Sequence, residues 1–293
     1  MYQAALWSDT TRIVNVASVL QRSPFRFPGG KTWLVPRIRQ WLTSLSYQPT
    51  EFIEPFAGGA IVGLTVAAEG LADHVTLVEL DENVAAVWQT ILHDEGGGEW
   101  LAKQIVNFDL THESAKVILA QLPRSTRERA FQTIIKNRVN RGGILAPGAG
   151  MIKVGENGKG LLSRWYPETL QRRILEIVRI RDRITFIHSD GMEVLRENAE
   201  RDDAVFFIDP PYTASSKQAG SRLYNHPNVD HKSLFETADL LVGDFLMTYD
   251  DAEGVRQLAE ERGFITRKIA MKNTHHAEMT ELLIGRDLCW VDG

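Results

Sequence analysis

Hydrophobic residues recur along the chain in two different spacings, and these spacings predict helices that alternate with strands. Residues 32–45 carry apolar side chains at helical spacing. Short apolar runs at 51–55 and 74–80 are typical of buried strands instead. A helix is expected over 61–68, directly after a glycine-rich turn. Strand, glycine turn, helix and strand together predict a βαβ unit.

A middle region interrupts this alternation. Between residues 93 and 170 the pattern predicts helices and a glycine-rich stretch over 141–160, without strands. From 171 onward strands and helices alternate again to the end of the chain. We therefore predict an α/β protein whose main domain is discontinuous, formed by residues 1–92 and 171–293, with a mainly helical insertion at 93–170.

Composition narrows the class of protein. The 293 residues are 43% hydrophobic and 24% charged, which are ordinary globular values that disfavour disordered, collagen-like or coiled-coil proteins. The single cysteine, Cys289, excludes a disulfide framework and a cysteine-ligated zinc site. No stretch approaches 18 apolar residues, so we expect no membrane span. Asp9, Arg12 and Arg22 interrupt the apolar residues of the first 24 positions, so we expect no signal peptide. These features fit a cytoplasmic protein.

Charge is distributed unevenly. The formal net charge is -5, but residues 116–183 hold 15 Lys and Arg against 5 Asp and Glu. This segment is therefore at +10 and the rest of the chain at -15. Such asymmetry indicates a surface that faces a polyanion, with a solvated arginine-rich helix face as the alternative.

The first candidate for chemistry is the turn at 54–60. Its glycines let backbone approach a ligand at the strand's carboxyl end, where open α/β sheets bind ligands. The spacing differs from the full dinucleotide-binding motif. Glu79 lies 21 residues after Gly58, where a carboxylate accepts hydrogen bonds from ribose hydroxyls. We expect a nucleoside without a pyrophosphate; for Glu79 the alternative is an ordinary carboxylate at a strand end.

The sequence Gly30-Lys31-Thr32 suggests a rival function, the phosphate loop of an NTPase. That motif requires a glycine five positions before Gly30, where this chain has Phe25, and a buried strand before the loop. Both are missing, which disfavours an NTPase.

The most specific motif is Asp209-Pro210-Pro211-Tyr212, which follows the apolar strand predicted at 204–208. The two prolines rigidify the turn and remove two donors, so the Asp209 carboxylate and the Pro210 carbonyl face a ligand as acceptors. An exocyclic amine offers two matching N–H donors, and Tyr212 offers a flat face for a base. A proline turn that only ends the strand would not explain the acid and the aromatic residue.

Together these motifs resemble the Dam-like DNA adenine-N6 methyltransferases of the α arrangement, and the resemblance covers nearly the whole chain. In that family the S-adenosylmethionine site precedes, and the Asp-Pro-Pro-Tyr motif follows, a target-recognition insertion. Residues 27–31 resemble its Pro-Gly-Gly-Lys element, 54–60 its cofactor loop and 79–81 its Asp-x-Asn element, with Glu79 and Asp81 replacing the usual aspartate and asparagine. The stretch 141–160 matches no known recognition sequence, so the target sequence stays open.

The resemblance implies a Rossmann-like S-adenosylmethionine-dependent fold. The implied reaction is site-specific transfer of a methyl group from S-adenosyl-L-methionine to N6 of a flipped-out adenine in double-stranded DNA. A bacterial or phage-encoded enzyme of the cytoplasm is expected, with a cognate restriction endonuclease as a candidate partner. An RNA adenine methyltransferase and a catalytically silent DNA-binding regulator are the rival functions.

The resemblance also implies three sets of residues. The catalytic residues are Asp209, Pro210, Pro211 and Tyr212. The cofactor-binding residues are Phe27, Gly29, Gly30, Lys31, Glu54, Pro55, Phe56, Gly58, Gly59, Ala60, Glu79, Leu80, Asp190, Gly191 and Asp209. The DNA-binding residues are Arg138, Asn140, Arg141, Arg164, Lys217, Arg222 and Tyr224.

Three of these assignments have structural alternatives. Asp190 would contact the cofactor adenine or only cap a helix. The loop 213–226 would close over the flipped base or be a mobile surface loop. We expect no metal site, because the adjacent His275 and His276 point to opposite faces of a strand.

Overall fold

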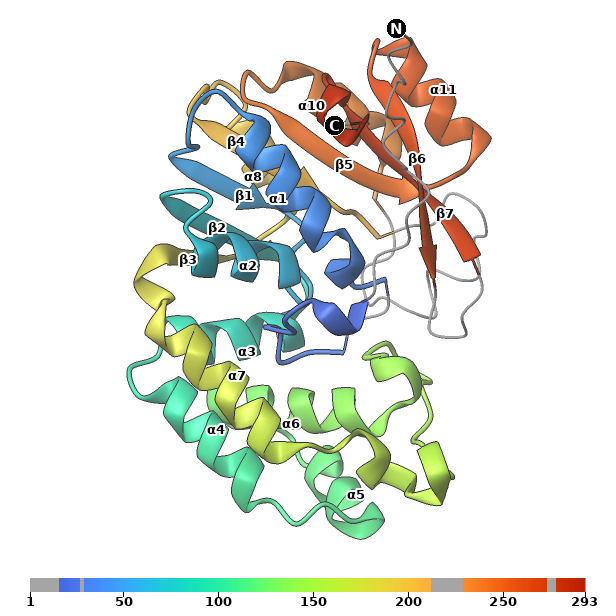
Figure 1. Ribbon diagram of the computed structural model, residues 1–293. Coiled ribbons are helices and arrows are strands. Elements are labelled where there is room, and N and C mark those ends of the chain that lie inside the picture. The colour runs from blue at the N-terminus through green and yellow to red at the C-terminus, as the bar shows by residue number, and fades with distance from the viewer. Residues whose placement is uncertain (1–15, 27–28, 212–228, 273–277, 293) are drawn as a thin grey trace, which may run out of the picture.

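The predicted alternation of strands and helices builds one seven-stranded sheet, and a group of helices lies beside it (Figure 1). This computed structural model describes residues 16–26, 29–211, 229–272 and 278–292. The strands are β1 (Glu51–Glu54), β2 (His74–Glu79), β3 (Ile184–His188), β4 (Ala204–Ile208), β5 (Phe245–Asp250), β6 (Ile265–Lys272) and β7 (Glu278–Gly285). The helices are α1 (Val35–Ser44), α2 (Ile61–Glu69), α3 (Glu82–Leu92), α4 (Gly97–Asn107), α5 (His112–Ala120), α6 (Thr126–Val139), α7 (Pro167–Arg179), α8 (Gly191–Glu197), α10 (His231–Leu240) and α11 (Glu253–Glu261).

The strand order is β3-β2-β1-β4-β5-β7-β6. β1 to β5 pair in parallel, whereas β7 runs antiparallel to both of its neighbours. The winding reverses between β1 and β4, which is where doubly wound sheets bind ligands outside the carboxyl ends of their strands. The predicted Rossmann-like α/β sheet is therefore confirmed, and Glu79 and Asp209 are brought to one edge of it.

Residues of the central strands point alternately to two hydrophobic layers. On β4, Val205 and Phe207 join the cluster that contains α1 and α2, whereas Phe206 and Ile208 join the cluster that contains α8 and α10. All five residues of β4 are buried, which explains why this strand is apolar throughout. Helices consequently cover both faces of the sheet, with α1 and α2 in front of it in Figure 1 and α8 behind it.

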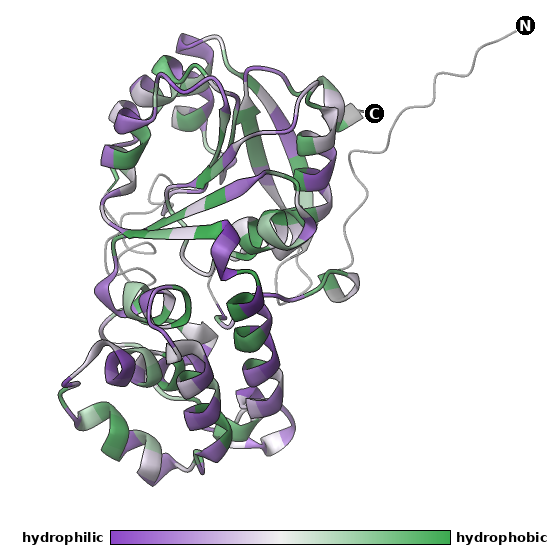
Figure 2. Cartoon of the chain, turned by 90° about the vertical axis from the view of Figure 1, so that its left-hand side faces the viewer, coloured by the Kyte–Doolittle hydropathy of each residue, from purple (hydrophilic) through white to green (hydrophobic). Residues whose placement is uncertain are grey.

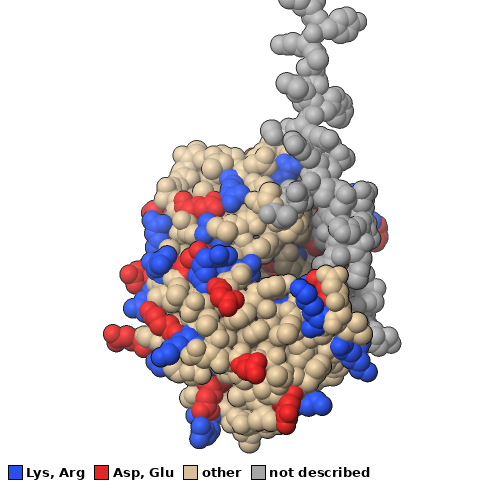
Figure 3. All heavy atoms as spheres, turned by 60° about the horizontal axis from the view of Figure 1, so that its bottom comes forward, with Lys and Arg blue, Asp and Glu red and all other residues tan. Residues whose placement is uncertain are grey.

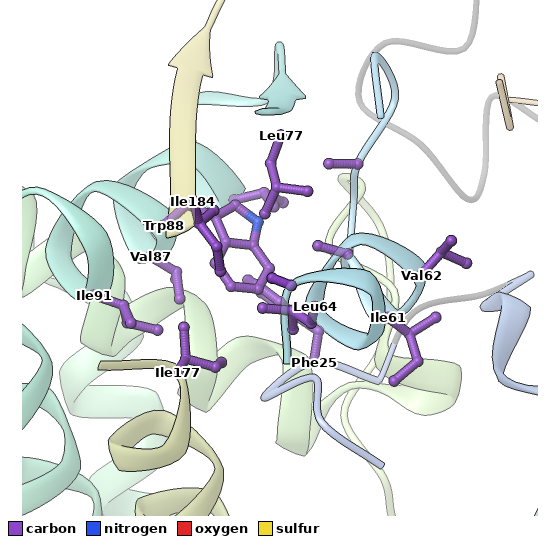
Figure 4. Packing of buried hydrophobic residues seen from close by; sticks show 14 of the residues in the cluster. Phe25, Ile61, Val62, Leu64, Leu77, Val87, Trp88, Ile91, Ile177 and Ile184 are labelled. Atoms are coloured by element: carbon purple, nitrogen blue, oxygen red, sulfur yellow. The ribbon is translucent and has the colours of Figure 1, made fainter. Parts of the chain in front are cut away.

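The helical part packs directly on the sheet layer rather than around a separate core. Trp88 of α3 is fully buried, and its ring lies 5.6 Å from that of Phe25 between centroids. Figure 4 shows Leu77 of β2 and Ile177 of α7 in the same cluster. One continuous core thus joins the two parts.

The helical part extends further along the chain than predicted. The expected boundary after residue 170 falls inside α7, and α7 packs along α4 over its length. Helix amphipathicity explains this, because α7 buries Leu170, Ile174 and Ile177 on one side. In Figure 2 the lower helices carry purple residues along one side and green along the other. None of the described helices is long and apolar enough to cross a membrane.

Candidate active site

A cavity of about 1660 Å³ opens at the carboxyl ends of β1, β2 and β4. The sheet edge forms one wall, and the helical part together with residues 23–26 forms the other. Every described residue predicted to be catalytic or cofactor-binding lines this cavity, and so do Arg138, Arg141 and Arg164. Phe27, Tyr212, Lys217, Arg222 and Tyr224 lie outside the described residues.

The turn after β1 is fixed from three directions. The Ala57 amide donates to the Val78 carbonyl at 2.9 Å, and the Trp88 indole donates to the Gly58 carbonyl at 3.0 Å. Gly58 and Ala60 have left-handed backbone conformations, with φ of 48° and 51°. A left-handed alanine costs conformational energy, and such residues concentrate at functional sites. Trp88 was not identified from the sequence, although it supports the turn.

Glu79 holds the same turn from the neighbouring strand. Its Oε2 accepts from the Gly58 amide at 2.9 Å and its Oε1 from the Asp81 amide at 2.8 Å. Burial raises the pKa of Glu79 to about 7, against the opposing effect of these amides. The carboxylate therefore has a structural role, and it also lines the cavity where ribose binding was predicted.

Glu54 lies deeper, with an exposed fraction of 3%. Its Oε2 accepts from the Gly63 amide at 2.8 Å, and burial raises its pKa well above the usual range. A Cβ on Gly63 would lie 2.6 Å from that oxygen, so glycine is required for this contact. Gly63 was not singled out in the sequence because it lies inside an otherwise ordinary helix.

Asp209 is held by two donors from other elements. Lys31 Nζ lies 3.0 Å from Asp209 Oδ1, and the Thr248 hydroxyl donates to the same oxygen at 2.7 Å. Lys31 is only 3% exposed, and its Nζ also lies 3.5 Å from Glu281 Oε2. Burial raises the pKa of Glu281 to about 7, although Lys31 opposes this shift. Lys31, predicted as a cofactor ligand, thus contacts the predicted catalytic acid Asp209. Thr248 contacts Asp209 and Glu281 contacts Lys31, and neither had been given a role from the sequence.

Asp190 caps α8, as the structural alternative predicted. Its Oδ1 accepts from the Met192 amide at 2.9 Å. At Gly191 an added Cβ would lie 2.0 Å from the Pro55 carbonyl oxygen, so glycine lets α8 approach the cofactor turn. Both residues line the cavity, and contact with the cofactor adenine stays a prediction.

The predicted DNA-binding residues occupy different environments. Arg141 is exposed and Arg164 is half-buried beside Glu156. Arg138 is only 4% exposed and donates to the Pro24 carbonyl. Asn140 is only 3% exposed, and its amide donates to the Ile144 carbonyl at 2.8 Å. Asn140 is therefore occupied inside its own turn and is absent from the cavity wall, which leaves it little access to DNA.

Part of the positive charge predicted for residues 116–183 is paired. Arg127 bonds Asp94 at 2.5 Å, and Arg129 bonds Glu82 at 3.0 Å. Both acids come from outside the basic segment, so the fold neutralises part of its excess. Figure 3 shows Lys and Arg interspersed with Asp and Glu on this face. Among the described residues, no group of three or more acidic, histidine or cysteine side chains is arranged to hold a metal.

Comparison with known protein families gives a match, and it includes residues at the sheet edge. A family model described as D12 class N6 adenine-specific DNA methyltransferase matches residues 27–122. The resemblance to N6-adenine DNA methyltransferases is thereby confirmed. The matched stretch contains the Pro-Gly-Gly-Lys element, the cofactor turn and Glu79, and it ends before Asp209.

Solved structures with similar folds are distant. The rRNA methyltransferase aviRa from Streptomyces viridochromogenes has a TM-score of 0.40 at 10% identity, over 98% of each chain. A precorrin-6y C5,15-methyltransferase from Geobacter metallireducens has a TM-score of 0.36 at 9% identity, over 84% of each chain. No curated protein matches the chain. The chain has a Rossmann-like α/β fold, and over residues 27–122 it resembles a family of DNA methyltransferases.

Proposed function

We propose that this protein is a site-specific DNA methyltransferase that transfers a methyl group from S-adenosylmethionine to N6 of a flipped-out adenine in double-stranded DNA. The observation that carries the proposal is the position of Asp209. It lies at the carboxyl end of β4, held by Lys31 and Thr248, in the same cavity as the turn and Glu79. We still predict that the protein is encoded by a bacterium or a phage and acts in the cytoplasm. A cognate restriction endonuclease stays a predicted partner.

The residues present fit S-adenosylmethionine. Glu79 offers carboxylate oxygens for ribose hydroxyls, and Gly58 and Gly59 leave room for the ligand above the sheet edge. Asp190, which lines the same cavity, would contact the adenine ring. The cavity exceeds the roughly 300–1,000 Å³ of ordinary small-molecule pockets, which provides space for a nucleotide beside the cofactor. When bound, S-adenosylmethionine supplies an electrophilic methyl group on its sulfonium.

Asp209 and Pro210 would supply the catalytic acceptors. The N6 lone pair of adenine is delocalised into the ring, so the amine is a poor nucleophile. Two acceptors that take both N6 protons turn the lone pair toward the methyl group and stabilise the positive charge that grows on N6. Lys31 and Thr248 hold Asp209 in place, so this arrangement exists before the reaction begins.

Lys31 alone would oppose that charge stabilisation, because its ammonium offsets the charge of Asp209. Glu281 restores the balance. Above pH 7, where Glu281 is mostly ionised, the group of Lys31, Asp209 and Glu281 carries one net negative charge. The developing charge on N6 therefore meets a negative environment, while Asp209 keeps a fixed orientation.

Duplex DNA has to release the target base before N6 reaches this site. Flipping costs a few kcal/mol, and stacking of the base on Tyr212 would return about 1–3 kcal/mol. Cationic residues on the opposite wall, among them Arg141 and Arg164, would contact the backbone beside the flipped base.

Mapping of N6-methyladenine by single-molecule sequencing tests the proposal. Cells without adenine methylation would express the protein or, as the matched control, its Asp209→Ala variant. We expect methylation at one recurring DNA sequence with the wild type and none with the variant. N6-methyladenine found only in RNA would show that the substrate is RNA and not DNA. A folded wild type that methylates neither DNA nor RNA would contradict the proposal.

A further inference from the structure

Three arginines from separate segments line the wall of the cavity opposite the carboxylates. Arg26 lies at the end of the described N-terminal segment, Arg138 on α6 and Arg173 on α7. Burial lowers the pKa of all three guanidinium groups. Repulsion by Arg173 and Arg26 adds to the burial of Arg138, and its pKa falls to about 9.

Neutral carbonyls are the partners of two of these side chains. Arg138 donates to the Pro24 carbonyl, and Arg173 donates to the Ser23 carbonyl at 3.0 Å. The buried Nε of Arg138 has no hydrogen-bond partner. Carbonyls satisfy N–H groups but do not neutralise charge, and burial of a charge without an opposite charge is costly.

Acidic residues do not compensate this cluster. Within the described part of the chain, no carboxylate lies within ion-pair distance of Arg26, Arg138 or Arg173, in contrast to the paired arginines on the outer surface. Glu156 acts on Arg26 and Glu176 acts on Arg173 from farther away, and Arg164 binds the Glu156 carboxylate. Within the described residues, this cavity wall therefore carries a positive charge without an ion-pair partner.

We infer that Arg26, Arg138 and Arg173 form a binding site for a single phosphate group of the nucleic-acid backbone. The inference rests on the proposed function, since it places this phosphate next to the flipped nucleotide. Guanidinium groups match phosphate oxygens in geometry as well as in charge. One phosphate bound here would join α6, α7 and the segment before the Pro-Gly-Gly-Lys element.

The carboxylate of S-adenosylmethionine is a weaker candidate for this site. That carboxylate sits beside an α-ammonium group, and the same molecule carries a sulfonium. Three guanidinium groups would repel both cations, whereas a phosphodiester presents negative charge alone. The acidic wall opposite is the better environment for the cationic part of the cofactor.

Two variants each remove one guanidinium group from the cluster, and they differ in how strongly they disturb folding. Arg26→Met leaves in place the two hydrogen bonds between the Arg26 backbone and the Asn137 side chain, at 2.9 and 2.8 Å. Arg138→Met removes the most buried of the three guanidinium groups. Arg172→Met is the matched control, because Arg172 is the exposed neighbour of Arg173 on α7 and does not line the cavity.

Duplex binding from 50 to 200 mM salt is the main measurement. We expect each cavity variant to bind about 10-fold more weakly, as for a lost charged hydrogen bond. Its log–log salt slope should fall by about 0.9, the value for one phosphate contact. Arg172→Met should stay within about twofold of the wild type, because its guanidinium lies outside the site.

Two further measurements show whether the three arginines bind a phosphate or the carboxylate of the cofactor. Inorganic phosphate should raise the melting temperature of the wild type over chloride at equal ionic strength, and should not do so for Arg138→Met. Calorimetry with S-adenosylmethionine should give equal affinities for the wild type and both cavity variants. A selective loss of cofactor affinity would overturn the inference in favour of the cofactor carboxylate.

The result that overturns the inference alone is a wild type that binds and methylates DNA while both cavity variants keep its affinity and salt slope. A wild type that neither binds nor methylates duplex DNA would instead remove the proposed function. In that case stabilisation by inorganic phosphate still decides whether the three arginines hold an anion.

Discussion

The two walls of the cavity have opposite charge and are supported in opposite ways. On the sheet edge, Glu79 accepts from backbone amides, and Asp209 lies against Lys31 and Thr248. On the helical wall, Arg138 and Arg173 meet only neutral carbonyls. The carboxylates of the acidic wall have protein donors, whereas the guanidinium groups of the cationic wall form no ion pair with any described residue. The comparison indicates that the first wall orients a small cationic or amine-bearing group and the second awaits a phosphate.

The largest effect should follow from the catalytic acceptor. Asp209→Asn replaces a charged acceptor with a neutral amide, and turnover should fall by about 10³-fold, as for loss of a preorganised stabilising group. Affinity for S-adenosylmethionine should stay within a few-fold. A tritium-transfer assay and calorimetry measure the two quantities. Asp203→Asn, just before β4 and outside the cavity lining, is the control, and substantial turnover by Asp209→Asn would remove Asp209 from its role.

Lys31→Met should lower turnover by about 10²-fold, because Asp209 loses its orienting cation. It should also lower the free energy of unfolding by about 3–5 kcal/mol, since two carboxylates at Asp209 and Glu281 would lose their buried partner. Urea unfolding measures the second effect. Adding Glu281→Gln should recover part of the stability, and a single variant as active and stable as the wild type would contradict the arrangement.

Glu79→Gln should weaken S-adenosylmethionine binding by about 1.5–3 kcal/mol, the range for hydrogen bonds to a charged group. Ribose hydroxyls need the ionised carboxylate as acceptor, and the pKa of Glu79 is about 7. Cofactor affinity of the wild type should therefore rise between pH 6 and 8 as Glu79 loses its proton, and the variant should lack this rise. Calorimetry at several pH values measures both, with exposed Glu82→Gln as control. Equal affinity and pH dependence in Glu79→Gln would leave Glu79 with its structural role alone.

The smallest effects should come from the cavity mouth. Arg141→Ala and Arg164→Ala should each reduce the salt slope of duplex binding by about 0.9 if they contact phosphates. A residue that reads a base would instead relax sequence preference at one position, at about 1–3 kcal/mol. Binding to duplexes that differ by one base pair separates these roles. Unchanged affinity, slope and preference in both variants would exclude this wall as the DNA-binding surface.

The acidic wall was predictable from sequence because local chemistry forms it. A strand, a glycine turn and Glu79 lie within one βαβ unit, and the apolar β4 places Asp209 at the same edge. The cationic wall was not predictable, because long-range packing forms it. Whether an arginine in α6 is exposed or buried depends on where residues 23–26 lie, and no local pattern gives that position. From the sequence, Arg138, Arg141 and Arg164 were named, and they line the cavity; Arg26 and Arg173, which line it too, were not.

The same distinction applies to the predicted boundary of the insertion, which falls inside α7. Residue 170 marked the point where the α/β pattern resumed, but α7 faces α4 rather than the sheet. Its hydrophobic stripe is compatible with either partner. Likewise, Lys31 was assigned by its motif to the cofactor, and only the fold shows that β7 brings Glu281 beside it.

Transfer of labelled methyl groups by the purified protein tests the proposed reaction most directly. The protein would be incubated with tritiated S-adenosylmethionine and either duplex DNA or RNA of the same sequence, and the products digested to nucleosides. We predict that the label appears in duplex DNA as N6-methyldeoxyadenosine and disappears with Asp209→Asn. Label found only in RNA, only on cytosine, or undiminished in Asp209→Asn would contradict adenine-N6 methylation of DNA at this site.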